Sequence, residues 1–428
     1  MTKNAVLMVA YHYPPEGSSS GVQRTLKFSC HLPSFGWTPH VLTLRESIYP
    51  VKDDTLKQHI PAAVTVHRTA GWDSTRHFAV RGRHLEWTAV PDPYISWLPF
   101  AVARGLRVIK ERDVRVIFST SPKPTAHLIA ATLKWRTRLP WVADFRDPWI
   151  DEGVHPRPGT LRLRVESRCE RYVMQCADGL TVTTPEMRDH YLRRYPQLPA
   201  AKVRVIFNGF DEADFEGIEP DRVPLRFEIL HAGLVTPEYR DPVPLLHAVA
   251  RLLSAGDLAR HDVRLTFLGC GTYVESETFA RIVRDLDLGG VVDVQRRIPH
   301  RETLRRLHEA AVLLVLQAAD TQTQIPAKLF EYLRVGRPVL ALAVEGATPR
   351  LLRELGAGVV VVPGAVDQIA HAVRALYQEW KTNHDRRTSV PGIAGFSRLA
   401  QTSGLARVLD ETAAATMHAA THGVLRNA

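Results

Sequence analysis

The stretch IPAKLFEYLRVGRPVL, residues 325–340, predicts a short helix that leads directly into a buried strand. Pro326 favours a helix N-terminus, and a Gly-Arg-Pro turn at 336–338 precedes the apolar strand. Lys328 and Glu331 are three residues apart near the helix start. A cation there suits a phosphate, because free backbone N–H groups and the helix dipole already favour an anion. A carboxylate one turn later can accept both hydroxyls of a ribose, so the pair predicts a nucleoside-diphosphate clamp.

The composition is that of a globular protein with an uneven charge. The chain has 428 residues, 45% of them hydrophobic and 23% charged, which is longer than one hydrophobic core usually supports. Residues 1–215 carry 30 Lys+Arg against 21 Asp+Glu, whereas the remainder carries 25 against 24. The basic first half predicts an anionic partner. Because the chain has no helix-turn-helix, zinc-finger or RNA-recognition signature, we expect no nucleic acid but a membrane surface or a lipid-phosphate substrate.

We expect no signal peptide at the N-terminus of this sequence. The N-terminus MTKNAVLMVAYHYPPEG has too short an apolar run for a signal peptide, and the four cysteines match no metal motif. We therefore expect a cytoplasmic protein, peripheral on the inner face of the cytoplasmic membrane. The segment LKWRTRLPW at 133–141 interleaves tryptophan with basic residues, as interfacial segments do. The alternative is a solvated helix end that leads into a core strand.

Short apolar runs alternate with helical patterns along nearly the whole chain, which predicts α/β domains with parallel sheets. The expected strands are 5–10, 39–44, 114–119, 141–144, 179–183, 202–207, 227–231, 263–268, 291–294, 312–316, 338–342 and 358–362. We expect two Rossmann-like, doubly wound domains, residues 1–215 and 216–385, followed by a C-terminal helical segment and tail at 386–428 whose last dozen residues fray. Ligands of such folds bind beyond the carboxyl ends of the strands, and this edge is expected to face an interdomain cleft.

The first half offers a small-residue loop that can approach a ligand closely. Gly17 and Gly21 bracket the loop after the first strand, and Arg24 follows one turn into the next helix. Backbone N–H groups in such a loop can contact a phosphate or a sugar hydroxyl. An ordinary β-α turn and a surface arginine are the alternatives.

Charged residues also follow the strand that is expected at 141–144. Asp144, Arg146 and Asp147 belong to DFRDPW, at the carboxyl end of that strand, where an aspartate can orient an acceptor hydroxyl or act as a base. An Asp–Arg pair that pins the loop is the alternative. His127, in the first turn of a helix, is a candidate ligand contact or a packed histidine.

In the second half, glycines and one arginine follow the strands. Gly233 and Gly269 each end a strand, which permits close backbone approach or makes a plain turn. Arg240 lies at a helix start and is a second cation able to join Lys328 on a diphosphate. The loop before Lys328, residues 317–324, supplies hydroxyls and amides that can bond to a pyrophosphate or a sugar.

These motifs together resemble the GT-B-fold glycosyltransferases of the large retaining family four, in the bacterial polysaccharide-biosynthesis subgroup. The resemblance rests on PPEG with GVQR, DFRDPW, YRDP and P-x-K-x-x-E, and it runs from about residue 4 to about residue 380. It implies that Arg240 and Lys328 grip the diphosphate of a nucleotide-sugar donor, with Leu329 beside them, and that Glu331 holds the ribose. Gly17 and Gly21 would bracket the loop beneath the transferred sugar.

The resemblance also implies a place for the reaction centre and shows two departures. Asp147, with Arg146, occupies the position where many relatives have a His or His-Asp pair. Thr323 stands where many members have a glutamate that contacts the donor sugar, and the loop is GSSSG rather than a denser glycine run. Both departures leave the identity of the sugar open.

The predicted activity is transfer of a sugar from a nucleotide-diphosphate sugar to a hydroxyl of a lipid-linked or saccharide acceptor, with retention. No D-x-D lies on a suitable loop, so we expect no metal and no other cofactor. A sugar-nucleotide epimerase of the same fold and a non-catalytic nucleotide-sugar-binding partner protein are the alternatives.

Overall fold

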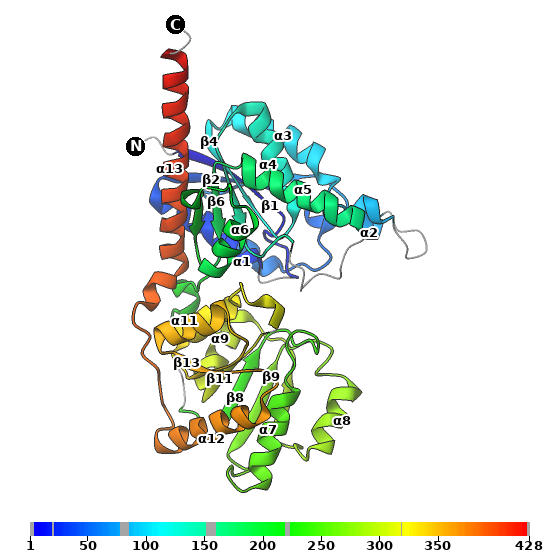
Figure 1. Ribbon diagram of the computed structural model, residues 1–428, viewed down its shortest axis with the longest axis vertical. Helices are drawn as coiled ribbons and strands as arrows, with labels where there is room; N and C mark the ends of the chain where they lie inside the picture. The colour runs from blue at the N-terminus through cyan, green and yellow to red at the C-terminus, as the bar shows by residue number, and fades with distance from the viewer. Residues whose placement is uncertain are drawn as a thin grey trace. The chain divides into compact units, whose positions relative to one another are not determined.

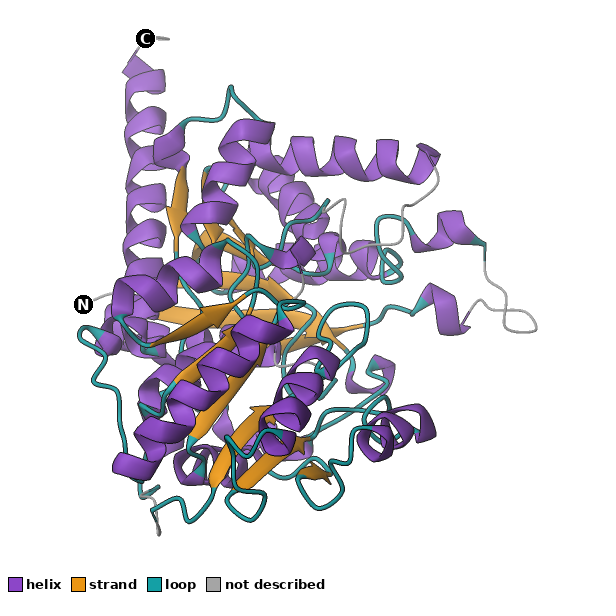
Figure 2. Cartoon of the chain, turned by 60° about the horizontal axis from the view of Figure 1, so that its bottom comes forward, coloured by secondary structure: helices purple, strands orange, loops and turns teal. Residues whose placement is uncertain are grey.

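A computed structural model describes residues 4–18, 21–77, 85–150, 160–218, 223–317 and 319–425. The chain divides into two compact units: Met1–Asn208 together with Arg398–Ala428, and Gly209–Ser397. Each unit contains one parallel sheet with helices packed around its strands (Figures 1 and 2). The α/β class with two doubly wound sheets is therefore confirmed.

The first unit contains a seven-stranded sheet in the order β3-β2-β1-β4-β5-β6-β7. Its strands are β1 (Asn4–Ala10), β2 (Trp37–Leu44), β3 (Thr65–Thr69), β4 (Val114–Thr120), β5 (Trp141–Phe145), β6 (Gly179–Val182) and β7 (Val203–Val205). Strand β1 pairs in parallel with both β2 and β4, and its apolar run is buried on both faces, as a central parallel strand requires. The direction of winding reverses between β1 and β4, so their carboxyl ends form the switch point of this sheet.

The second unit contains a six-stranded sheet in the order β10-β9-β8-β11-β12-β13. Its strands are β8 (Phe227–Ala232), β9 (Val263–Leu268), β10 (Val292–Gln295), β11 (Val312–Leu316), β12 (Val339–Leu342) and β13 (Gly358–Val361). Here the winding reverses between β8 and β11. The loops that follow these two strands therefore meet at one edge of the sheet.

Helices connect the strands in both units. The first unit has α1 (Gly21–His31), α2 (Ser74–His77), α3 (Trp97–Glu111), α4 (Pro124–Thr137), α5 (Thr160–Cys176), α6 (Pro185–Arg194) and α13 (Arg398–Leu425). The second has α7 (Val243–Ser254), α8 (Glu277–Asp285), α9 (His300–Glu309), α10 (Ala327–Val335), α11 (Ala347–Leu355) and α12 (Val366–Thr382). The helix expected from residues 325–340 is α10, and Gly336 ends it with a left-handed φ of 75°.

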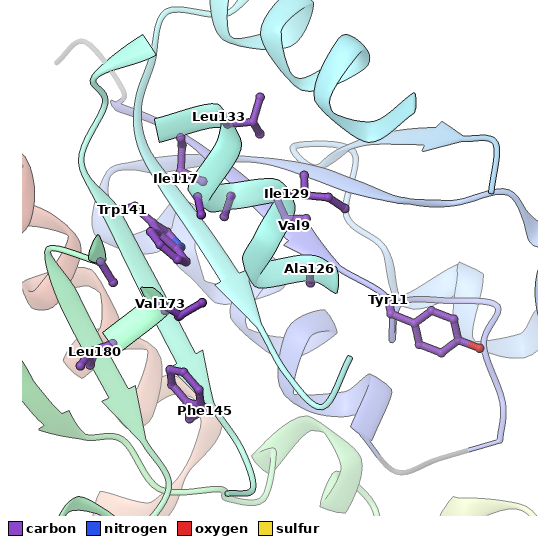
Figure 3. Packing of buried hydrophobic residues seen from close by; sticks show 14 of the residues in the cluster. Val9, Tyr11, Ile117, Ala126, Ile129, Leu133, Trp141, Phe145, Val173 and Leu180 are labelled. Atoms are coloured by element: carbon purple, nitrogen blue, oxygen red, sulfur yellow. The ribbon is translucent and has the colours of Figure 1, made fainter. Parts of the chain in front are cut away.

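The core of the first unit corrects the reading of residues 133–141. Figure 3 shows Leu133 on α4 and Trp141 on β5 within the buried cluster. Both side chains are 0% exposed, and the Trp141 indole N–H donates to Ser119 Oγ at 2.8 Å. Only Trp135, at 61% exposure, is a tryptophan of this segment that faces solvent. The segment is therefore mainly a helix end followed by a core strand, which was the alternative to an interfacial segment.

Helix α13 belongs to the first unit and runs along it (Figure 1). It packs against α1, β4 and β5, its Leu405 and Leu409 are fully buried, and Trp37 Nε1 donates to Asp410 Oδ1 at 3.1 Å. The helix continues to Leu425, so the expectation that the last dozen residues fray is wrong up to that point. Among the described residues, no helix has the length and apolarity needed to cross a bilayer.

Candidate functional site

In the second unit, the start of α10 meets the end of β8. Lys328 Nζ lies 3.2 Å from His231 Nε2, and the Tyr332 hydroxyl, one turn further along α10, accepts a hydrogen bond from Ala232 N–H at 3.1 Å. His231 Nδ1 lies 2.9 Å from the Leu314 carbonyl oxygen. Because a carbonyl only accepts, Nδ1 carries the proton and Nε2 accepts from the lysine. A neutral histidine therefore holds the amine in place.

The lysine stands in an electrostatically unfavourable position. Burial, followed by the nearby Arg240 guanidinium, lowers the pKa of Lys328 to about 7. Burial also lowers the pKa of Arg240. Among the residues that the structure describes, neither cation forms an ion pair with a carboxylate, and no side chain caps the N-terminus of α10 at Pro326. Two partly desolvated cations beside uncapped N–H groups form a site that favours an anion.

Glycines keep this site open. Gly233 has a φ of +111°, and a Cβ there would lie 2.9 Å from Lys328 Nζ. At Gly269, with φ of +63°, a Cβ would lie 3.3 Å from the Arg297 backbone, and at Gly271, with φ of +83°, it would lie 2.7 Å from a methyl group of Leu234. Both the backbone conformation and the space thus require glycine at the ends of β8 and β9.

The remaining donor-side residues fall into two groups. Glu331 is half-buried, and its Oε1 lies 3.0 Å from His300 Nε2, a partner that the sequence reasoning missed. Thr323 is half-buried in the loop before α10. Leu329 is 0% exposed and its N–H donates to the Pro326 carbonyl, so neither its side chain nor its amide is available to a ligand. The structure therefore argues against Leu329 as a contact residue.

A groove of about 570 Å³ lies elsewhere in this unit. Its lining includes Glu228, Arg264 and Arg306, beside the first residues of β8 and β9. It is therefore at the amino edge of the sheet, opposite to Lys328. Among the described residues, no group of three or more His, Cys, Asp or Glu side chains has the arrangement of a metal site.

In the first unit, two residues that were expected at the site are paired with each other in the core. Arg24 Nε and Nη2 donate to the two oxygens of Asp144 at 3.0 and 2.8 Å, and the exposed fractions are 1% and 0%. Thr120 and Thr181 hydroxyls donate to the same carboxylate, both at 2.7 Å. Burial raises the pKa of Asp144, but Arg24 and the threonines outweigh it and the net shift is downward.

This pairing corrects two expectations. Arg24 also donates to the carbonyls of Ile206 and Phe207, at 3.0 and 2.8 Å, and so ties α1 to β5 and to the segment after β7. The guanidinium and the carboxylate satisfy each other, which leaves no free group for a donor or for proton transfer. We interpret Arg24 and Asp144 as a structural ion pair. This corresponds to the alternative in which an Asp–Arg pair holds the loop in place, except that the arginine comes from α1 and not from the DFRDPW segment.

His127 is also a core residue. It is 0% exposed, its ring stacks on Phe145 with centroids 4.7 Å apart, and Nδ1 lies 2.8 Å from Ser119 Oγ. Burial lowers its pKa to about 4, so the ring is neutral. The packed-histidine alternative therefore fits, and a direct ligand contact does not.

Arg146 and Asp147 remain at the carboxyl edge of the sheet. Arg146 is half-buried, its N–H donates to Ser121 Oγ at 2.8 Å, and burial lowers the pKa of its guanidinium. Asp147 is exposed. Both remain candidates for contact with a substrate.

The loop after β1 holds a pair that the sequence reasoning missed. His12 Nδ1 lies 2.7 Å from Glu16 Oε2, and both residues are buried. An i, i+4 spacing was the available signal, although two prolines separate the residues and no helix is formed. Gly17 N–H donates to the Val51 carbonyl, and a Cβ at Gly17 would lie 2.9 Å from the backbone of Asp53, so chain pairing explains this glycine. Gly21 is the buried first residue of α1.

Comparison with known proteins adds sequence and fold relatives. Residues 21–209 match the model described as "Glycosyl transferase 4-like domain", and residues 226–379 match "Glycosyl transferases group 1". A D-inositol 3-phosphate glycosyltransferase of Catenulispora acidiphila is 28% identical over 221 residues, which is 49% of this chain and 51% of that protein. The chain thus matches about half the length of this relative.

Solved structures share the fold at low identity. A glycosyltransferase from Rickettsia africae superposes with a TM-score of 0.66 at 13% identity, covering 96% of this chain and 99% of that one. Anabaena Alr3699/HepE in complex with UDP gives a TM-score of 0.63 at 14% identity, covering 95% and 99%. These similarities show the GT-B fold, and the two family models, which together span most of both units, show that the chain belongs to the glycosyltransferase 4/group 1 family of nucleotide-sugar glycosyltransferases.

Proposed function

We propose that this glycosyltransferase binds the diphosphate of its donor between Lys328 and Arg240 and the ribose at Glu331. The observation that carries the proposal is the pair of partly desolvated cations without a carboxylate partner among the described residues, beside the uncapped start of α10. Such a pair is costly in the free protein and is stabilised when a diphosphate supplies the missing negative charge. Glu331 is three residues further along the same helix and would exchange His300 for the ribose hydroxyls.

We further propose that the sugar passes, with retention, to a hydroxyl of a lipid-linked or saccharide precursor held by the first unit. The basic excess of that half and the exposed Trp135 next to Arg136 support an acceptor presented at an anionic membrane surface on the cytoplasmic side. The cations supply positive charge to the leaving diphosphate, so the proposed reaction needs no metal ion. Transfer to a larger acceptor distinguishes this activity from epimerisation of the free donor.

The test combines binding and turnover. Titration calorimetry with UDP, GDP and other nucleoside diphosphates identifies the base, and radiolabelled sugar donors are then incubated with a membrane fraction, with and without EDTA. For Lys328→Ala we expect a loss of about 1.5–3 kcal/mol in diphosphate binding, or roughly 10- to 150-fold in Kd, with a parallel loss of transfer. Lys381→Ala, on the exposed face of α12, is the matched control and should bind as the wild type does. Unchanged affinity and transfer in Lys328→Ala would contradict the assignment, and binding without turnover by the wild type would favour a non-catalytic partner.

A further inference from the structure

Helices α3, α4 and α5 cover one face of the first sheet and carry much of the positive charge of the chain. Their apolar sides pack on one buried cluster, and α4 contacts both α3 and α5, whereas α1 and α13 pack on the opposite face of the sheet (Figure 1). The three helices contain nine Lys+Arg against three Asp+Glu, which is more than half of the net charge of +10. We call their solvent-facing side the basic face, and it consists of Phe100, Arg107, Lys110, Trp135, Arg136, Leu161, Arg164, Arg168, Arg171 and Tyr172.

Helix α5 shows the pattern of this face most clearly. Its exposed side begins with Leu161, which is 72% exposed, and ends with Tyr172, which is 47% exposed. The exposed side chains of Arg164, Arg168 and Arg171 lie between them at intervals of three or four residues, so all five belong to one side of the helix. Arginines on a solvated helix are ordinary, but large apolar side chains that gather among them in solvent indicate an interaction surface.

The acidic residues of these helices leave the charge of the face almost unopposed. Glu166 and Glu170 are 9% and 0% exposed, and they form ion pairs with Arg162 at 2.8 Å and with Arg194 at 3.0 Å. Helix α4 contains no Asp or Glu, and the remaining carboxylate is the exposed Glu111 at the end of α3. Within the described part of the chain, the three exposed arginines of α5 form no ion pair with a carboxylate. These cations are therefore available to an external anionic surface.

Aromatic side chains lie beside the cations of α4 and α3. Trp135, near the end of α4, is 61% exposed, and the Arg136 guanidinium lies 5.8 Å from the centroid of its ring. At the start of α3, the exposed Phe100 meets the exposed Trp72 edge-on, with centroids 5.4 Å apart. Arg107 follows Phe100 by two turns on the same side of the helix and is also exposed. Basic residues next to exposed aromatic and aliphatic ones are typical of helices that lie in the interface of a membrane.

We propose that the basic face docks the first unit on a bilayer that contains anionic phospholipids. Its arginines and lysines meet the headgroup phosphates, and Trp135, Leu161 and Tyr172 enter the boundary between headgroups and acyl chains. A nucleic acid also offers phosphates, but an exposed leucine gains nothing from that partner, and the sequence has no nucleic-acid-binding motif. The inference rests on the proposed function for its purpose, which is to bring the enzyme to a lipid-linked acceptor, whereas lipid binding itself requires no donor.

The experiment measures co-sedimentation of the full chain with phosphatidylcholine vesicles, with and without phosphatidylglycerol, in the absence of donor. Each basic residue at an anionic surface strengthens binding roughly fivefold. Joint replacement of Arg164, Arg168 and Arg171 by glutamine should therefore weaken binding to the anionic vesicles by about 100-fold. Wild-type binding should also weaken as salt is raised from about 0.1 M to 1 M, because the Debye length falls from about 10 Å to about 3 Å.

A matched control removes the same charge from the second unit. Arg281, Arg284 and Arg374 are exposed there, and their joint replacement by glutamine should leave vesicle binding unchanged. Trp135→Phe tests insertion, because phospholipids with brominated acyl chains quench the fluorescence of a tryptophan that enters the bilayer, and this variant should lose part of the quenching seen in the bound wild type. Circular dichroism and thermal unfolding verify that each variant is folded, as expected for substitutions of exposed side chains.

The outcomes separate this inference from the proposed function. Equal binding to vesicles with and without phosphatidylglycerol, equal losses in the two triple variants, or unchanged quenching in Trp135→Phe would overturn the docking face, while the diphosphate Kd still tests the donor site. Binding to duplex DNA or RNA through the same arginines, without binding to vesicles, would assign the face to a nucleic acid instead. Normal vesicle binding by a protein that transfers no sugar from any donor would overturn the proposed function alone.

Discussion

The proton on Lys328 gives the sharpest prediction. In the ligand-free protein, burial and Arg240 lower the pKa of this amine from 10.5 to about 7. A bound diphosphate supplies negative charge and must raise the pKa again, so binding above pH 7 takes up a proton. The Kd should therefore weaken as pH rises, by up to about tenfold for each pH unit. A window of about pH 7.5 to 9 isolates the lysine, because a terminal phosphate is already fully ionised there.

The magnitude follows from the size of the change in pKa. Lowering a lysine pKa from 10.5 to about 7 corresponds to roughly 5 kcal/mol against the charged form, at about 1.4 kcal/mol per pH unit. Because the Lys328 side chain is only half-buried, solvent screens its charge, and this free energy is an upper bound. Across the chosen window we expect the Kd to weaken by about 10- to 30-fold. The fractional proton uptake is measured by calorimetry in buffers of different ionisation enthalpy.

The same lysine should also make the stability of the ligand-free protein depend on pH. Its folded-state pKa is below its unfolded-state value, so the unfolded chain binds more protons between about pH 7 and pH 10.5 and stability rises with pH in that range. Lys328→Met should remove this rise and, at pH 7, raise the free energy of unfolding by about 1–3 kcal/mol while abolishing tight diphosphate binding. Lys328→Arg, which stays charged, should bind with a flat pH profile. A pH-independent Kd in the wild type would refute this explanation. So would a rise of stability with pH in Lys328→Met that is as steep as in the wild type.

Three further predictions test the glycine beside Lys328, the buried ion pair of the first unit and the independence of the second unit. Gly233→Ala forces a Cβ into a φ of +111° and against Lys328, and should destabilise the protein by about 1–3 kcal/mol and weaken diphosphate binding, measured by thermal unfolding with and without ligand. Arg24→Ala leaves the buried carboxylate of Asp144 without its cation, and should cost about 3–5 kcal/mol of stability in chemical denaturation; a loss below about 1 kcal/mol would contradict the structural role. Residues 209–397 expressed alone should fold and bind the diphosphate with near wild-type Kd, because the whole cation cluster lies within them; an unfolded product would show that the division is not one of folding units.

The sheets were predictable because their strands are central and parallel. Runs such as NAVLMVA are buried on both faces and read as continuous apolar segments, so all twelve expected strands match observed ones within about two residues at each end. Strand β3 (Thr65–Thr69) was not predicted, since this edge strand alternates half-buried and buried residues and contains His67 and Arg68. The expected strand at 202–207 is only Val203–Val205 in the structure, at the other edge.

A candidate site could be proposed from the sequence only where its residues are local in sequence. Lys328 and Glu331 share one helix turn, so their roles could be proposed from spacing. Arg24 and Asp144 are 120 positions apart, and each resembles a functional residue when considered alone. Their ion pair emerges only when α1 and β5 are packed in one unit. Sequence spacing does not reveal burial, and burial decided between the two interpretations of these charges.

The return of the chain from the second unit to α13 has a consequence for folding. The chain passes from the first unit into the second at Gly209 and returns to the first after Ser397. The two ends of this segment lie side by side, because the Phe210 N–H donates to the Phe396 carbonyl at 3.3 Å. A flexible loop of about 190 residues would oppose the docking of α13 through its closure entropy, whereas a prefolded segment with adjacent ends acts as a short loop and removes roughly 4 kcal/mol of that cost. The second unit is thus an inserted domain that brings the last helix back to the first. During synthesis, the first unit remains incomplete until α13 has left the ribosome, whereas the second unit can fold before it.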